Sequence, residues 1–114
     1  MDVRIKRVYA PRDEQDGKRV LVDRLWPRGL SKEKAEVDLW LKDVAPTTEL
    51  RQWFGHDPAR WEEFQKRYRA ELKENTDSVL ELKREAESGP LTLLYGARDE
   101  QHNEAVVLRS ILTR

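Results

Sequence analysis

Two arginines, an aspartate and a tryptophan lie close together in the chain, as Arg24, Arg28, Asp23 and Trp26. They directly follow residues 20–22, an apolar run that is typical of a buried strand. Guanidinium groups bind phosphate and carboxylate through paired hydrogen bonds, and ligands of α/β sheets bind beyond the carboxyl ends of the strands. We therefore expect Arg24 and Arg28 to bind an anionic ligand, with Trp26 beside it.

These residues also have a purely structural interpretation, which the sequence leaves open. Arg24 and Arg28 could instead pair with carboxylates such as Asp38 or Asp43 and hold the shape of the loop. Trp26 could serve as a packing wedge rather than as a surface on which a ligand stacks.

A second candidate site is the polar loop that follows the apolar run 91–95 and precedes a predicted helix over 103–113. The N-terminus of a helix presents unpaired N–H groups and the positive end of its dipole, so it binds anions readily. On this basis Tyr95, His102 and Asn103 are candidate ligand-contacting residues. The alternative for His102 and Asn103 is simple capping of the helix.

A third candidate is the segment from Arg51 to His56, where a histidine stands directly before Asp57. A histidine titrates near neutral pH and could act as a general acid or base, although it could equally bond a backbone carbonyl. We expect Arg51, together with the two arginines above, to neutralise the charge of a ligand. The groups that could handle protons or orient the ligand are Asp43, His56, Tyr68 and His102.

Composition narrows the classes of protein that this chain can be. Lys plus Arg and Asp plus Glu number 22 each, and without a basic excess nucleic-acid binding is not expected. No apolar stretch approaches the roughly 20 residues that span a bilayer, and residues 1–5 do not resemble a signal peptide, so we expect a cytoplasmic protein. With no cysteine and two histidines, we expect neither a metal nor another cofactor.

The hydrophobic pattern predicts an α/β fold in one domain, residues 1–114: a small three-layer sandwich with a three-stranded, mostly parallel sheet flanked by helices. The strands fall at 3–9, from 20 onward, and at 91–95, and the orientation of the first is left open. Helices are predicted from Ser31 to Pro46, in two pieces between Thr47 and Asn75, briefly from Ser78, and over 103–113. Helical spacing predicts that the following side chains are substantially buried: Trp40, Trp61, Phe64 and Leu108.

Several motifs together resemble the YeaO-like proteins, a prokaryotic group described as a domain of unknown function. The segments that carry the resemblance are RVLVDRLWPRG at 19–29, LKDVAP at 41–46, WFGHDP at 53–58, YRAEL at 68–72, LLYGA at 93–97 and HNEAVVL at 102–108. The resemblance spans nearly the whole chain and implies one YeaO-like α/β domain with no assigned reaction. A longer sister branch has Cys and His where this chain has Asn103 and Glu104. The thiol chemistry that the branch suggests is therefore not expected here, and without a cysteine the chain cannot act as a persulfide carrier.

The function that these observations favour is binding of a small phosphate- or carboxylate-bearing molecule in an arginine-rich cleft, with acid/base chemistry on it left open. The alternative is a non-catalytic protein-interaction module whose arginine and aromatic surface docks a partner protein. The sequence does not decide between an enzyme and a binding protein, and it leaves the oligomeric state open.

Overall fold

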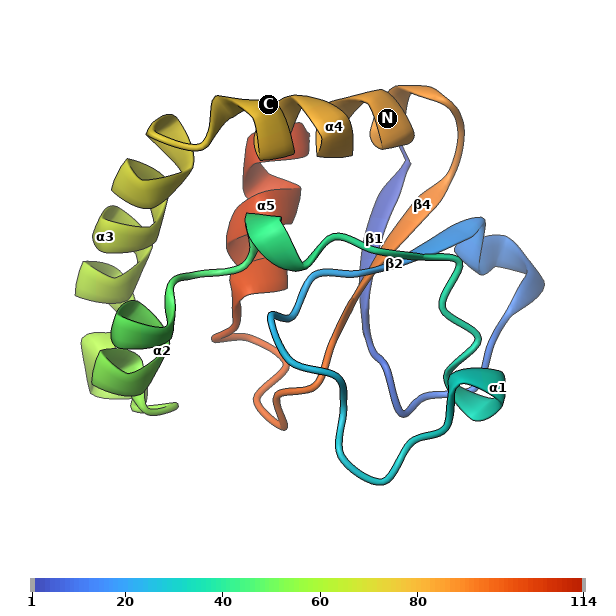
Figure 1. Cartoon of the computed structure of the whole chain (residues 1–114), viewed down its shortest axis with the longest axis horizontal. Coiled ribbons are helices and arrows are strands. Elements are labelled where there is room, and N and C mark those ends of the chain that lie inside the picture. Colours follow the sequence, from blue (N-terminus) through green and yellow to red (C-terminus); the bar gives the residue numbers. More distant parts are fainter. Residues whose placement is uncertain (1, 114) are drawn as a thin grey trace.

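A computed structural model describes residues 2–113 as an α/β fold (Figure 1). Its sheet has four strands. The sequence predicted the α/β class and the flanking helices correctly, but with three strands. The strands are β1 (Val3–Arg7), β2 (Lys18–Leu21), β3 (Leu39–Trp40) and β4 (Leu91–Tyr95). The α-helices are α1 (Lys32–Ala35), α2 (Thr48–Phe54), α3 (Trp61–Lys73), α4 (Thr76–Glu87) and α5 (Glu104–Leu112).

All strand pairs of the sheet are parallel, in the order β1-β4-β2-β3. Strand β4 lies between β1 and β2 (Figure 1) and is buried along its whole length. The sequence of a strand that is covered on both faces is mostly apolar, as it is in residues 91–95. The open question about the first strand is thereby answered: β1 is parallel to β4 and forms an edge of the sheet.

The prediction of one helix from Ser31 to Pro46 was wrong. Helix α1 ends after one turn, where Glu36 adopts a left-handed conformation with φ +49°. The backbone N–H of Asp38 then donates to Arg19 O (2.9 Å), so the chain pairs with β2 as strand β3. The apolar residues 37–44 contact the core from an extended segment and a 3-10 turn, which is why their helical spacing misled the prediction.

The remaining helices are close to the sequence prediction. Thr47 caps α2, whose end is closed by Gly55, and the break before α4 falls at Asn75. Helix α4 is longer than the turn or two predicted from Ser78, because it begins at Thr76 and runs to Glu87. No helix among residues 2–113 is both long and apolar enough to cross a bilayer.

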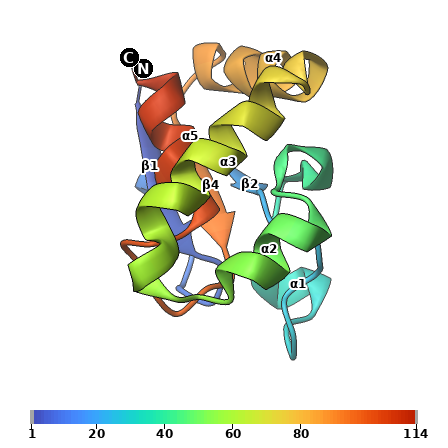
Figure 2. The same cartoon turned by 90° about the vertical axis from the view of Figure 1, so that its left-hand side faces the viewer.

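The two faces of the sheet are covered unequally. The larger core lies on the face of Val20, Leu93 and Tyr95, where side chains of α2 to α5 pack; Figure 2 shows α3 and α5 in front of the strands. Phe64 and Leu108 belong to this core and are buried, as predicted, whereas Trp61 is half-buried at its margin. A smaller cluster covers the opposite face, with half-buried Trp40 against it; its buried members are Val8, Leu21, Ala35 and Leu94.

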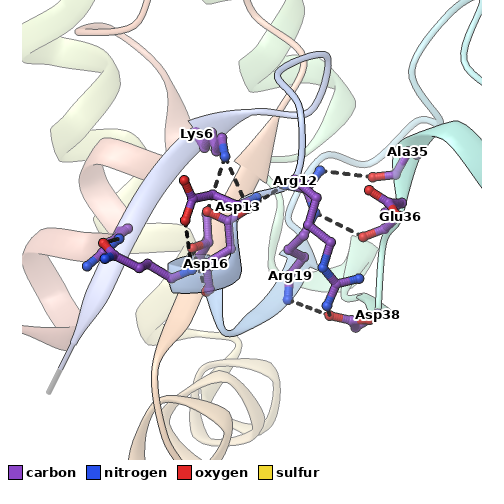
Figure 3. A network of polar contacts seen from close by, with 11 residues as sticks. Lys6, Arg12, Asp13, Asp16, Arg19, Ala35, Glu36 and Asp38 are labelled. Atoms are coloured by element: carbon purple, nitrogen blue, oxygen red, sulfur yellow. Dashed lines mark hydrogen bonds and ion pairs between the residues drawn. The ribbon is translucent and has the colours of Figure 1, made fainter.

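A buried charged network supports this second face (Figure 3). Arg19 is only 1% exposed and donates to the Asp16 carboxylate at 2.8 Å and to the carbonyls of Ala35 and Glu36 at 2.9 Å. Lys6 also bonds Asp16, at 3.1 Å. Burial raises the pKa of Asp16, but hydrogen bonds from the Asp13 backbone, Arg19 and Lys6 outweigh burial and lower it. The network fixes the end of α1 beside β2.

Candidate functional site

A cavity of about 420 Å³ lies beyond the carboxyl ends of β2 and β4. This volume falls in the range of small-molecule sites, roughly 300–1,000 Å³. Four segments form its wall: the end of β1, the loop after β2, the region from Ala45 through α3, and the loop from β4 into α5. The lining residues are Tyr9, Asp23, Arg24, Leu25, Trp26, Pro27, Arg28, Ala45, Pro46, Arg51, Phe54, His56, Phe64, Gly96, Ala97, His102, Asn103 and Glu104.

The topology explains why a cleft forms there. After β2 the chain passes to α1, whose Ala35 packs on the second face of the sheet. After neighbouring β4 it passes to α5, whose Leu108 packs on the first face. Adjacent connections that leave in opposite directions open a crevice at the carboxyl edge, and ligands of open α/β sheets bind in such crevices.

Asp23 connects the two strand ends that form this crevice. Its Oδ2 accepts a hydrogen bond of 2.8 Å from the Gly96 backbone N–H, and its own carbonyl accepts one of 2.7 Å from Trp40 Nε1. A Cβ at residue 96 would lie 2.9 Å from Asp23 Oδ2, so a glycine is required for this approach. The aspartate is therefore held at a fixed position in the cleft wall.

Glu104, in the first turn of α5, brings a second carboxyl group against Asp23. Burial raises the pKa of Glu104 well above its ordinary value, and the charge of Asp23 and a side-chain hydrogen bond with it raise this pKa further. The positive charge of Arg51 acts in the opposite direction. Sequence reasoning did not select Glu104, because an acidic residue in a helix's first turn is ordinary and its contact with Asp23 joins distant parts of the chain.

The three arginines that the sequence singled out all line the cavity, but they differ in their exposure and in their hydrogen bonds. Arg24 Nε donates to Pro46 O at 3.1 Å and Nη2 to Ala45 O at 3.0 Å, so it also holds the opposite wall in place. Arg28 and Arg51 are exposed, and their guanidinium groups make no hydrogen bond or ion pair within residues 2–113. They are the cations that an incoming anion can reach most easily.

The predicted histidines and Asn103 also lie at the cavity. His102 Nδ1 is 2.8 Å from Asp99 Oδ2, and its ring meets Trp61 edge-on at 5.2 Å. Hydrogen bonds from the Gln101 backbone and from His102 lower the pKa of Asp99. His56 is exposed at the rim with φ +58°. Asn103 caps α5 by accepting from the Val106 N–H at 3.2 Å, as its alternative interpretation predicted.

The other predicted site residues are more peripheral. Trp26 lines the cavity, and it also donates to Leu30 O at 2.6 Å and packs edge-on against Trp40. Tyr68 and Tyr95 are buried behind the wall, where burial raises the pKa of both.

Asp43 lies outside this cleft. It lines a separate, smaller hollow between residues 39–44 and the start of α4. Over the described chain, residues 2–113, no three His, Asp or Glu side chains gather closely enough to hold a metal ion. The cavity is thus composed of arginines, two carboxyl groups, histidines and an aromatic wall.

Fold and cleft together define an α/β protein with a small-molecule-sized cavity at a topological switch point. A family model described as "Inactive DUF488-N3 subclade" matches residues 2–114, and the chain belongs to this family. It is 43% identical over 108 residues to the uncharacterised protein YeaO of Escherichia coli K12, covering 95% of this chain and 94% of that protein. An uncharacterised Mycobacterium tuberculosis H37Rv protein, Rv3073c, is 42% identical over 110 residues, covering 96% and 92%. No solved structure matches the chain.

Proposed function

We propose that this protein binds a small molecule bearing a phosphate or carboxylate group in the cleft between β2 and β4. The observation that carries the proposal is the presence of Arg24, Arg28 and Arg51 around one cavity of about 420 Å³. Guanidinium groups pair with such anions through two parallel hydrogen bonds. Arg28 and Arg51 are free to do so within the described chain, and Arg24 uses two of its five donors on the loop carbonyls.

The charge balance of the cleft supports an anionic ligand. Because the pKa of Glu104 is raised, the two neighbouring carboxyl groups retain a proton to higher pH than isolated ones do. Even with both carboxyl groups ionised, the three arginines leave the cavity lining positive. The positive end of the α5 dipole at Asn103 acts in the same direction.

The proposal assigns binding and no reaction. The family is described as inactive, which favours a binding role over catalysis by His56 or His102. A contiguous exposed apolar patch is a common sign of a protein-interaction surface. The exposed large apolar side chains among the described residues are Tyr9 and Leu25, at the cleft, and Leu80, on α4 away from it. This distribution favours a cleft ligand over a broad docking surface.

Inorganic phosphate, followed by amide NMR shifts, provides the test. We expect shifts at Gly96, Asn103 and the loop 23–28 of the wild type. Replacing two charge-assisted contacts in an Arg28→Gln, Arg51→Gln variant should weaken binding by roughly tenfold or more. Arg84→Gln, an exposed arginine on α4 outside the cleft, is the matched control and should bind like the wild type. Equal affinity in all three proteins, or shifts confined to the loop 11–18, would contradict the proposal.

A further inference from the structure

The imidazole ring of His102 reaches the cleft with one of its two nitrogens already bonded. Its Nδ1 lies 2.8 Å from Asp99 Oδ2, and the ring meets Trp61 of α3 edge-on at 5.2 Å. His102 lines the cavity, whereas Asp99 and Trp61 are not among the lining residues. Both contacts therefore hold the ring from outside the cavity lining.

The carboxylate of Asp99 is itself fixed by the loop that leads into α5. Its Oδ1 accepts from the backbone N–H of Gln101 at 2.9 Å and from that of His102 at 3.1 Å. The Asp99 carbonyl accepts from the side-chain amide of Asn103 at 2.9 Å. Hydrogen bonds from Gln101 and His102 lower the pKa of Asp99, so its carboxylate is ionised at neutral pH and can only accept.

An acceptor at Nδ1 decides which ring nitrogen carries the proton. In a neutral imidazole one nitrogen donates and the other accepts, and the hydrogen bond of one sets the role of the other. Because Asp99 only accepts, Nδ1 of His102 holds the proton and Nε2 of the neutral ring has a lone pair. Protonation of the ring places an N–H on Nε2 as well. Nε2 thereby changes from an acceptor, which an anion avoids, into a cationic donor, which an anion binds.

Nε2 of His102 is the nitrogen that a ligand can reach. It makes no hydrogen bond within residues 2–113. No buried side-chain nitrogen or oxygen in that part of the chain lacks a partner, so Nε2 is open to solvent. His56, the other histidine of the chain, also lines the cavity. It has no carboxylate partner among the described residues, which makes it an internal comparison for His102.

The charged groups around His102 come from several segments of the cavity wall. Trp61, its contact on α3, carries no charge. On its own loop the charged residues are Arg98, Asp99 and Glu100. The charged or titratable groups that line the same cavity are Tyr9, Asp23, Arg24, Arg28, Arg51, His56 and Glu104. Glu104 has to be distinguished from His102 by experiment, because its raised pKa brings its titration toward the range of histidine.

We propose that Asp99 positions His102 as a pH-dependent ligand of the anion, so that the cleft binds its anion more tightly when the ring is protonated. This inference rests on the proposed function, because His102 adds a fourth cation to the three arginines of the same cavity. His102 contacts the anion, and Asp99 is a positioning residue that acts through it.

Titration of the two histidines in the wild type, with and without saturating sulfate, tests the inference without any substitution. Sulfate keeps two negative charges from about pH 5 to about pH 8, the interval over which histidine titrates, whereas phosphate changes its charge there. An anion that prefers the protonated ring raises the midpoint of its titration, by about one pH unit for a tenfold preference. By NMR of the ring resonances, we expect a rise of about one unit at His102 and a clearly smaller one at His56.

The outcomes of this titration separate the inference from the proposed function. An unchanged midpoint at His102, or a rise no larger than that at His56, would overturn the inference. If sulfate still shifts the cleft amides in that case, the proposed function stands. If sulfate shifts no cleft amide at any pH, the proposed function fails and the inference fails with it.

The tautomer of the neutral His102 ring tests the role of Asp99 in the absence of a ligand. Ring ¹⁵N shifts above the titration midpoint distinguish the protonated nitrogen from the bare one. We expect the proton on Nδ1 in the wild type and a mixture of tautomers in Asp99→Asn, whose amide can donate as well as accept. A proton on Nε2 in the wild type, or the same tautomer ratio in both proteins, would refute the positioning role.

Two single substitutions assign the pH dependence of sulfate affinity to one residue. His102→Gln removes the titrating ring and should weaken sulfate binding roughly tenfold near pH 5 but little near pH 8. Glu104→Gln removes the carboxyl group with the raised pKa and should retain most of the wild-type pH dependence. Full pH dependence in His102→Gln, or its loss in Glu104→Gln, would contradict the assignment to His102.

Discussion

The carboxylate of Asp23 and the backbone N–H of Gly96 are joined by a hydrogen bond of 2.8 Å that ties the ends of β2 and β4 together. The two residues are 73 positions apart in the chain. A carboxylate that accepts from a backbone N–H is a charge-assisted bond, and here it fixes the geometry of the cleft.

Gly96→Ala should destabilise the protein by about 1–3 kcal/mol, because the methyl group displaces the Asp23 carboxylate and leaves polar groups unpaired. Urea denaturation of a double-mutant cycle with Asp23→Ala measures the coupling. In the Asp23→Ala background, Gly96→Ala should cost much less, since the obstructing carboxylate is absent. The same cost in both backgrounds would show that Gly96 is needed for another reason.

The Tyr68 hydroxyl supports the opposite wall, because it donates to Val44 O from a fully buried position. Tyr68→Phe should lower the free energy of unfolding by about 1–2 kcal/mol, since the buried carbonyl loses its partner. Tyr9→Phe is the matched control: it removes an exposed hydrogen bond to Arg28 O and should cost less than about 0.5 kcal/mol. Similar losses in the two variants, by denaturant melts, would argue against a supporting role for Tyr68.

Glu104 makes the stability of the protein depend on pH. Its pKa is higher in the folded state than in the unfolded chain, about 4.3, so the folded state holds the proton more tightly. Its stabilising contribution is therefore complete below about pH 4.3 and is lost as pH rises through the folded pKa. Glu104→Gln does not titrate, so its stability relative to the wild type should increase with pH over that interval.

Denaturant melts at pH 5, 6, 7 and 8 measure this difference. Glu62→Gln, an exposed residue in the first turn of α3, is the control and should show a constant difference from the wild type. A constant difference for Glu104→Gln as well would contradict the raised pKa.

Much of the fold follows from local signals in the sequence. The run Leu91–Tyr95 is apolar throughout and forms the central strand β4. Thr47 and Gly55 cap α2 as their residue types predict. The sequence did not predict strand β3, because a strand of two residues is too short to show an alternating hydrophobic pattern. Its pairing depends on Arg19, whose burial with Asp16 no local pattern signals.

The candidate site was predictable where it lies at strand ends and not where it depends on tertiary contacts. Arg24 and Arg28 follow a recognisable buried strand, and the structure places both at the cavity. Glu104 looks like an ordinary helix-start residue, and only the pairing of β2 with β4 brings it to Asp23. Asp43 lies in a 3-10 turn outside the cleft, because the helix expected through 31–46 does not form.

The most direct test of the anion-binding cleft is a crystal structure of the protein with tungstate, a tetrahedral dianion that scatters X-rays strongly. We predict an ordered tungstate in the cavity between β2 and β4, within hydrogen-bond distance of the Arg28 and Arg51 guanidinium groups. Tungstate bound only outside the cleft, or a cleft that stays empty at saturating tungstate, would contradict the account.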